Sequence, residues 1–278
     1  MQDTKRGGMQ SIKPTVGIGI MSWKNPAVLA RTLETYFSQG LFQAVDDHLL
    51  LFQEASPEDT ALADQWGLRY IATNENRGIY GGVKKLAETI QTDYVLLLED
   101  DCILIEDADQ VKRQLEVAVQ RLAAGEVDVY RLRHRFEPGE KFDTLNKYKR
   151  YYTLPGESFN VKKCLRRLVR PFKYRRLMGS AVYAHDQLSA RPYTAFIQKQ
   201  NEGDYIIASS VMNWTNQSIL CSRKWLLETI LPYVEQNPSR RTVNGFQDIE
   251  RSLNGRWWRQ QRFKIGVGLG LFSHKRLG

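Results

Sequence analysis

Three consecutive carboxylates are the residues of this sequence best suited to chemistry. Glu99, Asp100 and Asp101 directly follow residues 94–98, a run of five apolar side chains. Such a run predicts a strand buried on both faces, so the acids lie at its carboxyl end, the edge of an open α/β sheet where ligands bind. Oxygen ligands suit hard ions such as Mg²⁺ or Mn²⁺, which also accept substrate phosphates. We therefore expect a metal–diphosphate site. The alternative is a turn in which Asp100 or Asp101 caps the next helix.

The elements that must position these acids alternate along the first half of the chain. Five segments rich in β-branched or other apolar residues predict strands: 15–23, 48–52, 68–72, 94–98 and 128–132. Between them, apolar residues recur at helical spacing. This alternation is typical of an α/β fold with a mostly parallel sheet and helices on both faces.

The second half is less regular. Residues 178–184 have a strand-like pattern, and residues 225–234 have helical spacing. Another predicted helix begins near Phe246 and contains Trp257, and residues 265–274 form a glycine-spaced extended segment. We therefore expect the second half to be irregular.

The length of 278 residues allows one large domain with a sizeable core. We expect a disordered tail over 1–13, a regular half over 14–130 and an irregular half of the same domain over 131–278. The three cysteines lack the paired spacing of a disulfide framework or a zinc site. The sequence contains no signal-peptide pattern and no apolar run of about 20 residues. We expect a cytoplasmic protein whose membrane contact, if any, is peripheral, at the inner face of the plasma membrane.

Positive charge is concentrated in one segment. The chain has 40 Lys and Arg against 31 Asp and Glu, a net charge of +9, and residues 131–176 contain 15 of the former and 4 of the latter. A basic patch suits nucleic acid, an anionic membrane or a phosphorylated substrate. Within it, residues 162–176 combine Leu165, Leu168 and Val169 with many cations, which predicts either a basic amphipathic helix on anionic lipid or a solvated face.

Over residues 15–105 the order of motifs resembles glycosyltransferases of the GT-A fold, closest to the large inverting family 2 that includes bacterial polysaccharide synthases. The segment from Ser22 to Pro26 is similar to the family's nucleotide-binding turn, and Gln53-Glu54-Ala55-Ser56 stands where Asp-Asp-Gly-Ser is usual. Asn76-Arg77-Gly78 matches the donor loop, and Glu99-Asp100-Asp101 matches the Asp-x-Asp element.

The resemblance implies a role for each of these residues. Asp101 would ligate Mn²⁺ or Mg²⁺, and His274 would supply a late metal ligand unless it is only a surface residue. The nucleotide sugar would contact Ser22, Trp23, Asn25, Glu54, Asn76, Arg77, Gly78, Glu99 and Asp100, with Glu54 binding the base and Glu99 facing the ribose or a metal-bound water.

The resemblance also implies an acceptor side. Asp248 is the expected catalytic base, with Glu250 second; the alternative is a pair of acids favoured by the helix dipole, worth under about 1 kcal/mol. Trp214 and Asn216 are expected at the acceptor, where the Trp214 ring would stack on a sugar, unless it belongs to the core.

The implied function is metal-dependent, inverting transfer of a sugar from a nucleotide diphosphate sugar to a hydroxyl of a glycan or lipid-linked acceptor, in bacterial surface polysaccharide synthesis. A nucleotidyltransferase is one alternative, but it would need a Gly-rich phosphate loop after the first strand, which the segment from Ser22 to Pro26 lacks. A basic nucleic-acid-binding module is another, but the acidic strand end would repel a polyanion. We expect no nucleic-acid partner.

Overall fold

The computed structural model describes residues 13–275 except 141, 155, 186–187, 189–192, 194, 241 and 244. The expected disordered tail over 1–13 therefore lies, apart from its last residue, outside the described residues.

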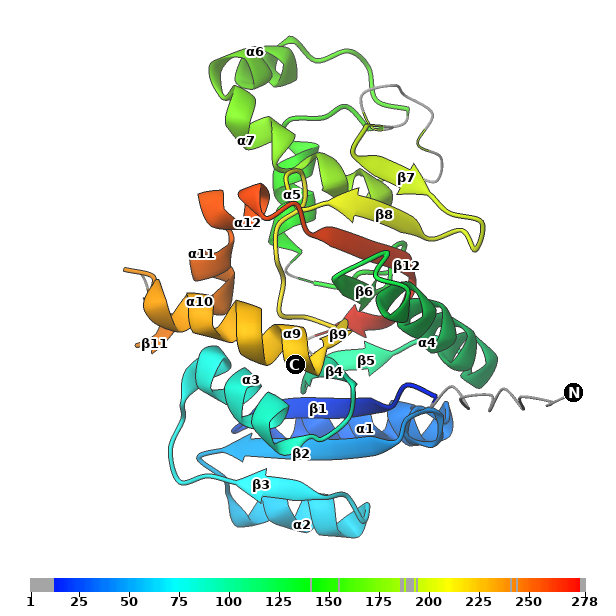
Figure 1. The fold of residues 1–278 in the computed structure, drawn as a ribbon, viewed down its shortest axis with the longest axis vertical. Coiled ribbons are helices and arrows are strands. Elements are labelled where there is room, and N and C mark those ends of the chain that lie inside the picture. The colour runs from blue at the N-terminus through cyan, green and yellow to red at the C-terminus, as the bar shows by residue number, and fades with distance from the viewer. Residues whose placement is uncertain are drawn as a thin grey trace, which may run out of the picture.

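A ten-stranded mixed sheet runs through the described chain (Figure 1). Its strands are β1 (Val16–Trp23), β2 (Asp47–Gln53), β3 (Tyr70–Ala72), β4 (Tyr94–Glu99), β5 (Cys102–Leu104), β6 (Val129–Arg133), β7 (Ile197–Lys199), β8 (Tyr205–Ala208), β9 (Ile219–Ser222) and β12 (Lys264–His274). The order is β3-β2-β1-β4-β9-β6-β12-β8-β7, and β5 pairs with β12. A separate antiparallel pair is formed by β10 (Thr242–Val243) and β11 (Phe246–Gln247).

The sheet is parallel from β3 to β4 and between β6 and β12, whereas β9, β8, β7 and β5 pair antiparallel to their neighbours. The α/β class is confirmed, as are the five strands predicted in the first half. The irregular second half adds antiparallel strands to the same sheet.

The longer helices cover the sheet, and several short ones belong to the second half (Figure 1). They are α1 (Pro26–Ser38), α2 (Pro57–Gln65), α3 (Gly78–Thr89), α4 (Ala108–Ala123), α5 (Asp143–Lys149), α6 (Val161–Val169), α7 (Pro171–Arg175), α9 (Arg223–Trp225), α10 (Leu231–Gln236), α11 (Ile249–Leu253) and α12 (Arg256–Gln260). A π-helical turn over Leu226–Ile230 joins α9 to α10, and a 3₁₀ helix spans Met178–Tyr183.

Two hydrophobic cores lie on opposite faces of the sheet, because side chains alternate along each strand. In β4, Val95 and Leu97 join the core that contains the inner face of α3, whereas Leu96 and Leu98 join the core that contains α1 and α4. Both faces of the central strands are therefore covered, as their unbroken apolar sequence predicts.

The strand predicted over residues 178–184 is wrong. Met178–Tyr183 is a 3₁₀ helix whose six residues are all buried. The Gly179 N–H donates to the Val211 carbonyl, and a Cβ on Gly179 would lie 2.7 Å from the Met212 side chain. A short apolar run cannot be assigned to strand or helix by periodicity alone, and here close packing on the loop after β8 selects the helix.

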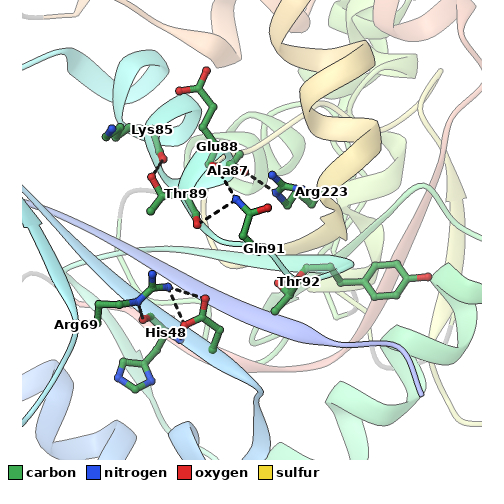
Figure 2. Close-up of polar contacts among 11 residues, drawn as sticks. His48, Arg69, Lys85, Ala87, Glu88, Thr89, Gln91, Thr92 and Arg223 are labelled. Carbon is green, nitrogen blue, oxygen red and sulfur yellow. Dashed lines mark hydrogen bonds and ion pairs between the residues drawn. The ribbon is translucent and has the colours of Figure 1, made fainter. Parts of the chain in front are cut away.

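Polar contacts fix the edge of the sheet where the parallel strands begin (Figure 2). Arg223, at the start of α9, donates its Nε–H to the Ala87 carbonyl near the end of α3 at 2.7 Å. Arg69 pairs with both carboxylate oxygens of Asp47 at 2.6 and 2.8 Å. The opposite edge, at the carboxyl ends of β1, β2 and β4, holds most of the candidate donor-site residues.

A β-bulge in β12 depends on Gly270. The pairing of β12 with β6 shifts register between Val267 and Phe272, and Gly270 has a φ of +91°. Its N–H donates to the side-chain oxygen of Gln114 at 2.7 Å, and its carbonyl accepts from the same amide at 3.1 Å. The buried backbone groups that the bulge removes from the ladder are therefore satisfied.

Replacing Gly270 with alanine should destabilise the fold strongly. A Cβ there would lie 2.3 Å from the Arg133 carbonyl oxygen, so roughly 1–3 kcal/mol of overpacking adds to the left-handed strain of about 1–2 kcal/mol. Gly125→Ala is the matched control, since Gly125 also has positive φ but no atom within 4 Å of its Cβ position. Urea unfolding of both variants checks this. Equal losses of stability would contradict the clash.

Candidate functional site

The carboxyl end of β4 brings two acids against the end of β12. In the antiparallel pairing of β5 with β12, His274 lies opposite Cys102, next to the acids that precede this residue in the chain. The His274 Nε2 atom lies 2.9 Å from Asp101 Oδ1. One ligand atom each from Glu99, Asp101 and His274 lies within 4.8 Å of the other two. The structure therefore brings together the two residues expected as metal ligands and Glu99.

Burial makes this cluster electrostatically unfavourable without a cation. Asp101 and His274 are only 8% and 4% exposed. Burial, followed by the charges of Asp101 and Glu250, raises the pKa of Glu99 to about 8. Like charges that are removed from water together favour protonation or the binding of a positive ion.

The donor atoms fit a divalent ion. Asp101 Oδ1 and His274 Nδ1 are buried without a hydrogen-bond partner of acceptable geometry, despite the close approach of the two side chains. Two carboxylates and an imidazole suit Mn²⁺ better than Mg²⁺, because imidazole prefers transition metals. The capping alternative for Asp100 and Asp101 is not realised: the N-cap of α4 is Asp107, whose side chain accepts from the Gln110 N–H.

Asp100 points to β1 rather than to the cluster. The Ser22 hydroxyl donates to its carboxylate at 3.0 Å, and the Thr32 hydroxyl donates to its carbonyl at 2.7 Å. Burial raises the pKa of Asp100 to about 6, and hydrogen bonds from Ser22, the Trp23 backbone and the Asn25 side chain oppose this. Asp100 therefore fixes the turn after β1 against the end of β4.

Trp23, Lys24 and Glu54 form a cluster where β1 and β2 end. The Trp23 indole N–H donates to the Glu54 carboxylate at 2.6 Å, and Lys24 Nζ lies 2.8 Å from the same oxygen. Lys24 first and Trp23 second hold the pKa of Glu54 below its usual value. Lys24 and Glu54 have φ angles of 53° and 50°, and strained backbone of this kind often marks a functional site. Lys24 lies within the predicted turn from Ser22 to Pro26, but the sequence analysis did not single it out as a site residue.

The loop over 76–78 contacts both halves. Its Arg77 N–H donates to the Gln53 side-chain oxygen, and its Gly78 N–H donates to Asn76 Oδ1, at 2.8 and 2.7 Å. Gly78 has a φ of +64°, and a Cβ there would lie 2.3 Å from Phe246 Cβ. Gln53, which departs from the family's acid, therefore anchors the loop, and glycine permits its contact with the segment before Asp248.

Asp248 and Glu250 differ in their surroundings. The Asp248 carboxylate caps α11 by accepting the Glu250 N–H at 2.9 Å, and it lies 3.3 Å from Arg251 Nε. Glu250 accepts the Asn216 N–H at 3.2 Å, and burial raises its pKa. The charge of Glu250 also raises the pKa of Glu99. Glu250 is thus the acid of this pair that interacts with the candidate metal cluster.

Trp214 lies in the core, the second of the two interpretations drawn from the sequence. It is 4% exposed, and its ring packs edge-on against Trp258 at 5.5 Å between centroids. Its indole N–H donates to Asn216 Oδ1 at 2.8 Å. With its ring enclosed, Trp214 cannot stack on a sugar in this structure. Trp214 and Asn216 instead hold the segment whose backbone binds Glu250.

Part of the basic segment 131–176 is structural. Arg131, Arg133 and Arg135 are 3–6% exposed and donate to backbone carbonyls, including those of Asn213, Pro138 and Val182 respectively. Their charges also act on the site. The positive charge of Arg131 opposes the rise in the pKa of Glu250, and that of Arg133 opposes the rise in the pKa of Glu99. The expectation that these arginines belong to a surface patch is wrong, because Arg131 and Arg133 lie in β6, whose five residues are all buried, and Arg135 is buried just after it.

Comparison with known families now gives the identity. Residues 18–176 match the family described as "Glycosyl transferase family 2". The chain belongs to this family. It is therefore a glycosyltransferase. No curated protein matches the chain.

Several solved structures of glycosyltransferases resemble the chain in fold at low sequence identity. The chain is 10% identical to S. aureus TarS (residues 1–349) over 94% of its own length and 60% of that chain, with a TM-score of 0.51. It is 12% identical to Mycobacterium tuberculosis glucosyl-3-phosphoglycerate synthase over 96% of its own length and 72% of that chain, with a TM-score of 0.51. It is 10% identical to the Pyrobaculum calidifontis mannosyltransferase PcManGT over 93% of its own length and 58% of that chain, with a TM-score of 0.48. The chain thus spans about three fifths of two of these structures. The two likenesses with a TM-score of 0.51 show the GT-A fold.

No helix within the described ranges has the length and apolar character needed to cross a membrane.

Removing the imidazole should weaken Mn²⁺ binding. His274→Ala deletes one of three candidate ligands, and we expect a loss of at least about tenfold in Mn²⁺ affinity. Even mutation of a residue that only hydrogen-bonds to a metal ligand typically lowers metal affinity by about 10–100-fold. Titration of the protein with Mn²⁺ alone, followed by calorimetry, measures this. His134→Ala is the matched control, because His134 is also buried and lies 3.0 Å from a carboxylate, Glu106. Unchanged affinity in His274→Ala would rule out this ligand set.

Proposed function

We propose that this family 2 enzyme is metal-dependent and inverting, and that it transfers a sugar from a nucleoside diphosphate sugar to an acceptor hydroxyl. The observation that carries the proposal is the cluster of Glu99, Asp101 and His274 at the carboxyl end of β4, beside the ends of β1 and β2. Such an edge is where ligands bind in α/β sheets.

The donor would lie over the ends of β1 and β2 and the loop over 76–78. Glu54, oriented by Trp23 and Lys24, would accept hydrogen bonds from the base. Ser22, Asn25 and Asp100 would hold the turn that contacts the nucleotide. Asn76, Arg77 and Gly78 would approach the donor sugar. The comparison protein from M. tuberculosis was solved with Mn²⁺, UDP and phosphoglyceric acid, which supports a donor of this class.

Asp101 and His274 would hold Mn²⁺, with Glu99 beside them directly or through water. When bound, the ion would stabilise the negative charge that develops on the departing diphosphate. Arg133, whose guanidinium acts on Glu99, would limit repulsion between the acids before the donor arrives. The same residues would make donor binding depend on the metal.

Glu250 is the proposed base, with Asp248 as a positioning residue. Glu250 would take the proton of the acceptor hydroxyl while the acceptor oxygen forms a bond to the anomeric carbon. The bond from that carbon to the diphosphate oxygen breaks on the opposite face, so one displacement inverts the centre. A positioned base contributes typically about 10²–10⁴-fold. Asp248, as the N-cap of α11, would fix the backbone that carries Glu250.

The acceptor would carry an anionic group, as a lipid-linked diphosphate or an acidic glycan does. A cavity of about 480 Å³ lies between α7 and α12. It is lined by Phe172, Arg175, Arg176, Phe196, Ser210, Val211, Arg256 and Arg259. Four arginines without a carboxylate suit phosphate, and Arg259 Nη1 is buried without a partner. The cavity therefore supports an acceptor with an anionic group, and surface polysaccharide synthesis is the proposed pathway.

Single substitutions of Glu250 and of Asp248 should show which of the two acids is the base. Glu250→Gln removes the proton acceptor and should lower kcat by about 10²–10⁴-fold while leaving the donor affinity within a few-fold. Asp248→Asn keeps an N-cap and should retain most of kcat. Steady-state kinetics with donor-binding measurements on both variants checks this. A larger loss of kcat in Asp248→Asn than in Glu250→Gln would assign the base to Asp248 instead.

A screen of nucleoside diphosphate sugars with Mn²⁺ should find one that raises Tm. At 100 times its Kd a ligand stabilises by about 2.7 kcal/mol, and Asp101→Ala should lose this effect for donor plus Mn²⁺. Product analysis separates the alternatives: release of a nucleoside diphosphate supports sugar transfer. Release of pyrophosphate from a nucleoside triphosphate and a sugar phosphate would favour a nucleotidyltransferase.

A further inference from the structure

The helix α6 presents its apolar side to solvent. Val161, Leu165, Leu168 and Val169 recur at helical spacing on one face and are 60–77% exposed. None of the nine residues of α6 is buried. Of the large hydrophobic residues that are exposed in the described chain, most lie here or directly beside it, since Phe159 and Phe172 are each 78% exposed. A contiguous exposed apolar patch of this kind marks an interaction surface.

The opposite face of α6 is held against the protein by cations. Lys163 Nζ donates to the Tyr152 carbonyl at 2.9 Å and to Glu157 at 2.5 Å. The Arg167 guanidinium lies 5.9 Å from the centre of the Tyr152 ring. A surface helix normally turns its apolar face inward. In α6 the arrangement is reversed, and the polar contacts fix the helix with its leucines outward.

The charge around this patch has one sign. Residues 158–176 contain eight Lys and Arg and no Asp or Glu. A cavity of about 430 Å³ lies between α5 and α6. It is lined by Lys147, Arg150, Tyr151, Leu165, Arg166, Val169, Arg170 and Lys173. Five cations next to two exposed apolar side chains match a lipid phosphate with the start of its acyl chains.

We infer that α6 and α7 dock the protein on an anionic phospholipid bilayer, with the apolar face of α6 inserted at the headgroup boundary and the surrounding cations on lipid phosphates. Amphipathic helices bind membranes by this combination of apolar burial and charge. A second copy of the chain is a poorer occupant, because a self-complementary contact would place cation against cation. Nucleic acid would leave the apolar face uncovered. The inference does not depend on the transfer chemistry.

Co-sedimentation with vesicles tests the inference. The protein should bind vesicles of phosphatidylcholine mixed with phosphatidylglycerol, and bind pure phosphatidylcholine much more weakly. Leu165→Ser combined with Leu168→Ser should weaken partitioning by about tenfold or more. Lys162→Gln should weaken it about fivefold, the effect of one basic residue near an anionic surface. High salt should reduce the binding of all forms.

Two matched controls should bind as the unchanged protein does. Phe136→Ser removes an exposed aromatic outside the patch, and Lys112→Gln removes an exposed lysine on α4. Three results would each overturn the inference: equal binding to both kinds of vesicle, no binding to either, or a change from dimer to monomer in the leucine variant without vesicle binding. Mn²⁺-dependent nucleotide binding by the same samples shows separately whether the transferase site is intact.

Discussion

The pairing of β5 with β12 is the contact on which the candidate site depends, because it places a histidine from the end of the chain against acids from its first half. Carboxylates buried near one another are unfavourable unless a cation or protons neutralise them. Here burial raises the pKa of Glu99 to about 8, while Asp101 Oδ1 and His274 Nδ1 are buried without a hydrogen bond. The folded protein therefore contains an electrostatically unfavourable cluster, and a bound divalent ion would stabilise it.

The geometry of this contact is determined far from the acids. The bulge at Gly270 changes the register of β12, so that Phe272 pairs with Arg133 and with Leu104 of β5. The side-chain amide of Gln114 replaces the ladder hydrogen bonds that the bulge loses. A residue of α4 and a glycine of β12 thus decide where the imidazole of His274 lies, although neither takes part in chemistry.

Local patterns in the sequence predicted five of the six strands of the first half, but not β5, the short strand that pairs with β12. The strand that ends in Glu99 is buried on both faces, and its unbroken apolar run signals that directly. The burial of Arg131 and Arg133 was not predicted, because a strand covered on both faces can accommodate arginines only if carbonyls of loops outside the strand accept their hydrogen bonds. Those loops come from residues 138–140 and from Asn213, and no local pattern predicts such partners.

The different surroundings of the two acids after β11 could not be predicted from the sequence either. Asp248 and Glu250 both lie at the start of α11, and only the tertiary structure gives Glu250 its contact with the Asn216 N–H and its influence on the pKa of Glu99. The next helix, α12, lines the arginine cavity, whose other wall is α7, an element of the proposed membrane surface. The two proposals are consistent with each other, because α7 borders both the proposed membrane surface and the arginine cavity, and α12 on the other side of that cavity directly follows α11, the helix that contains Glu250.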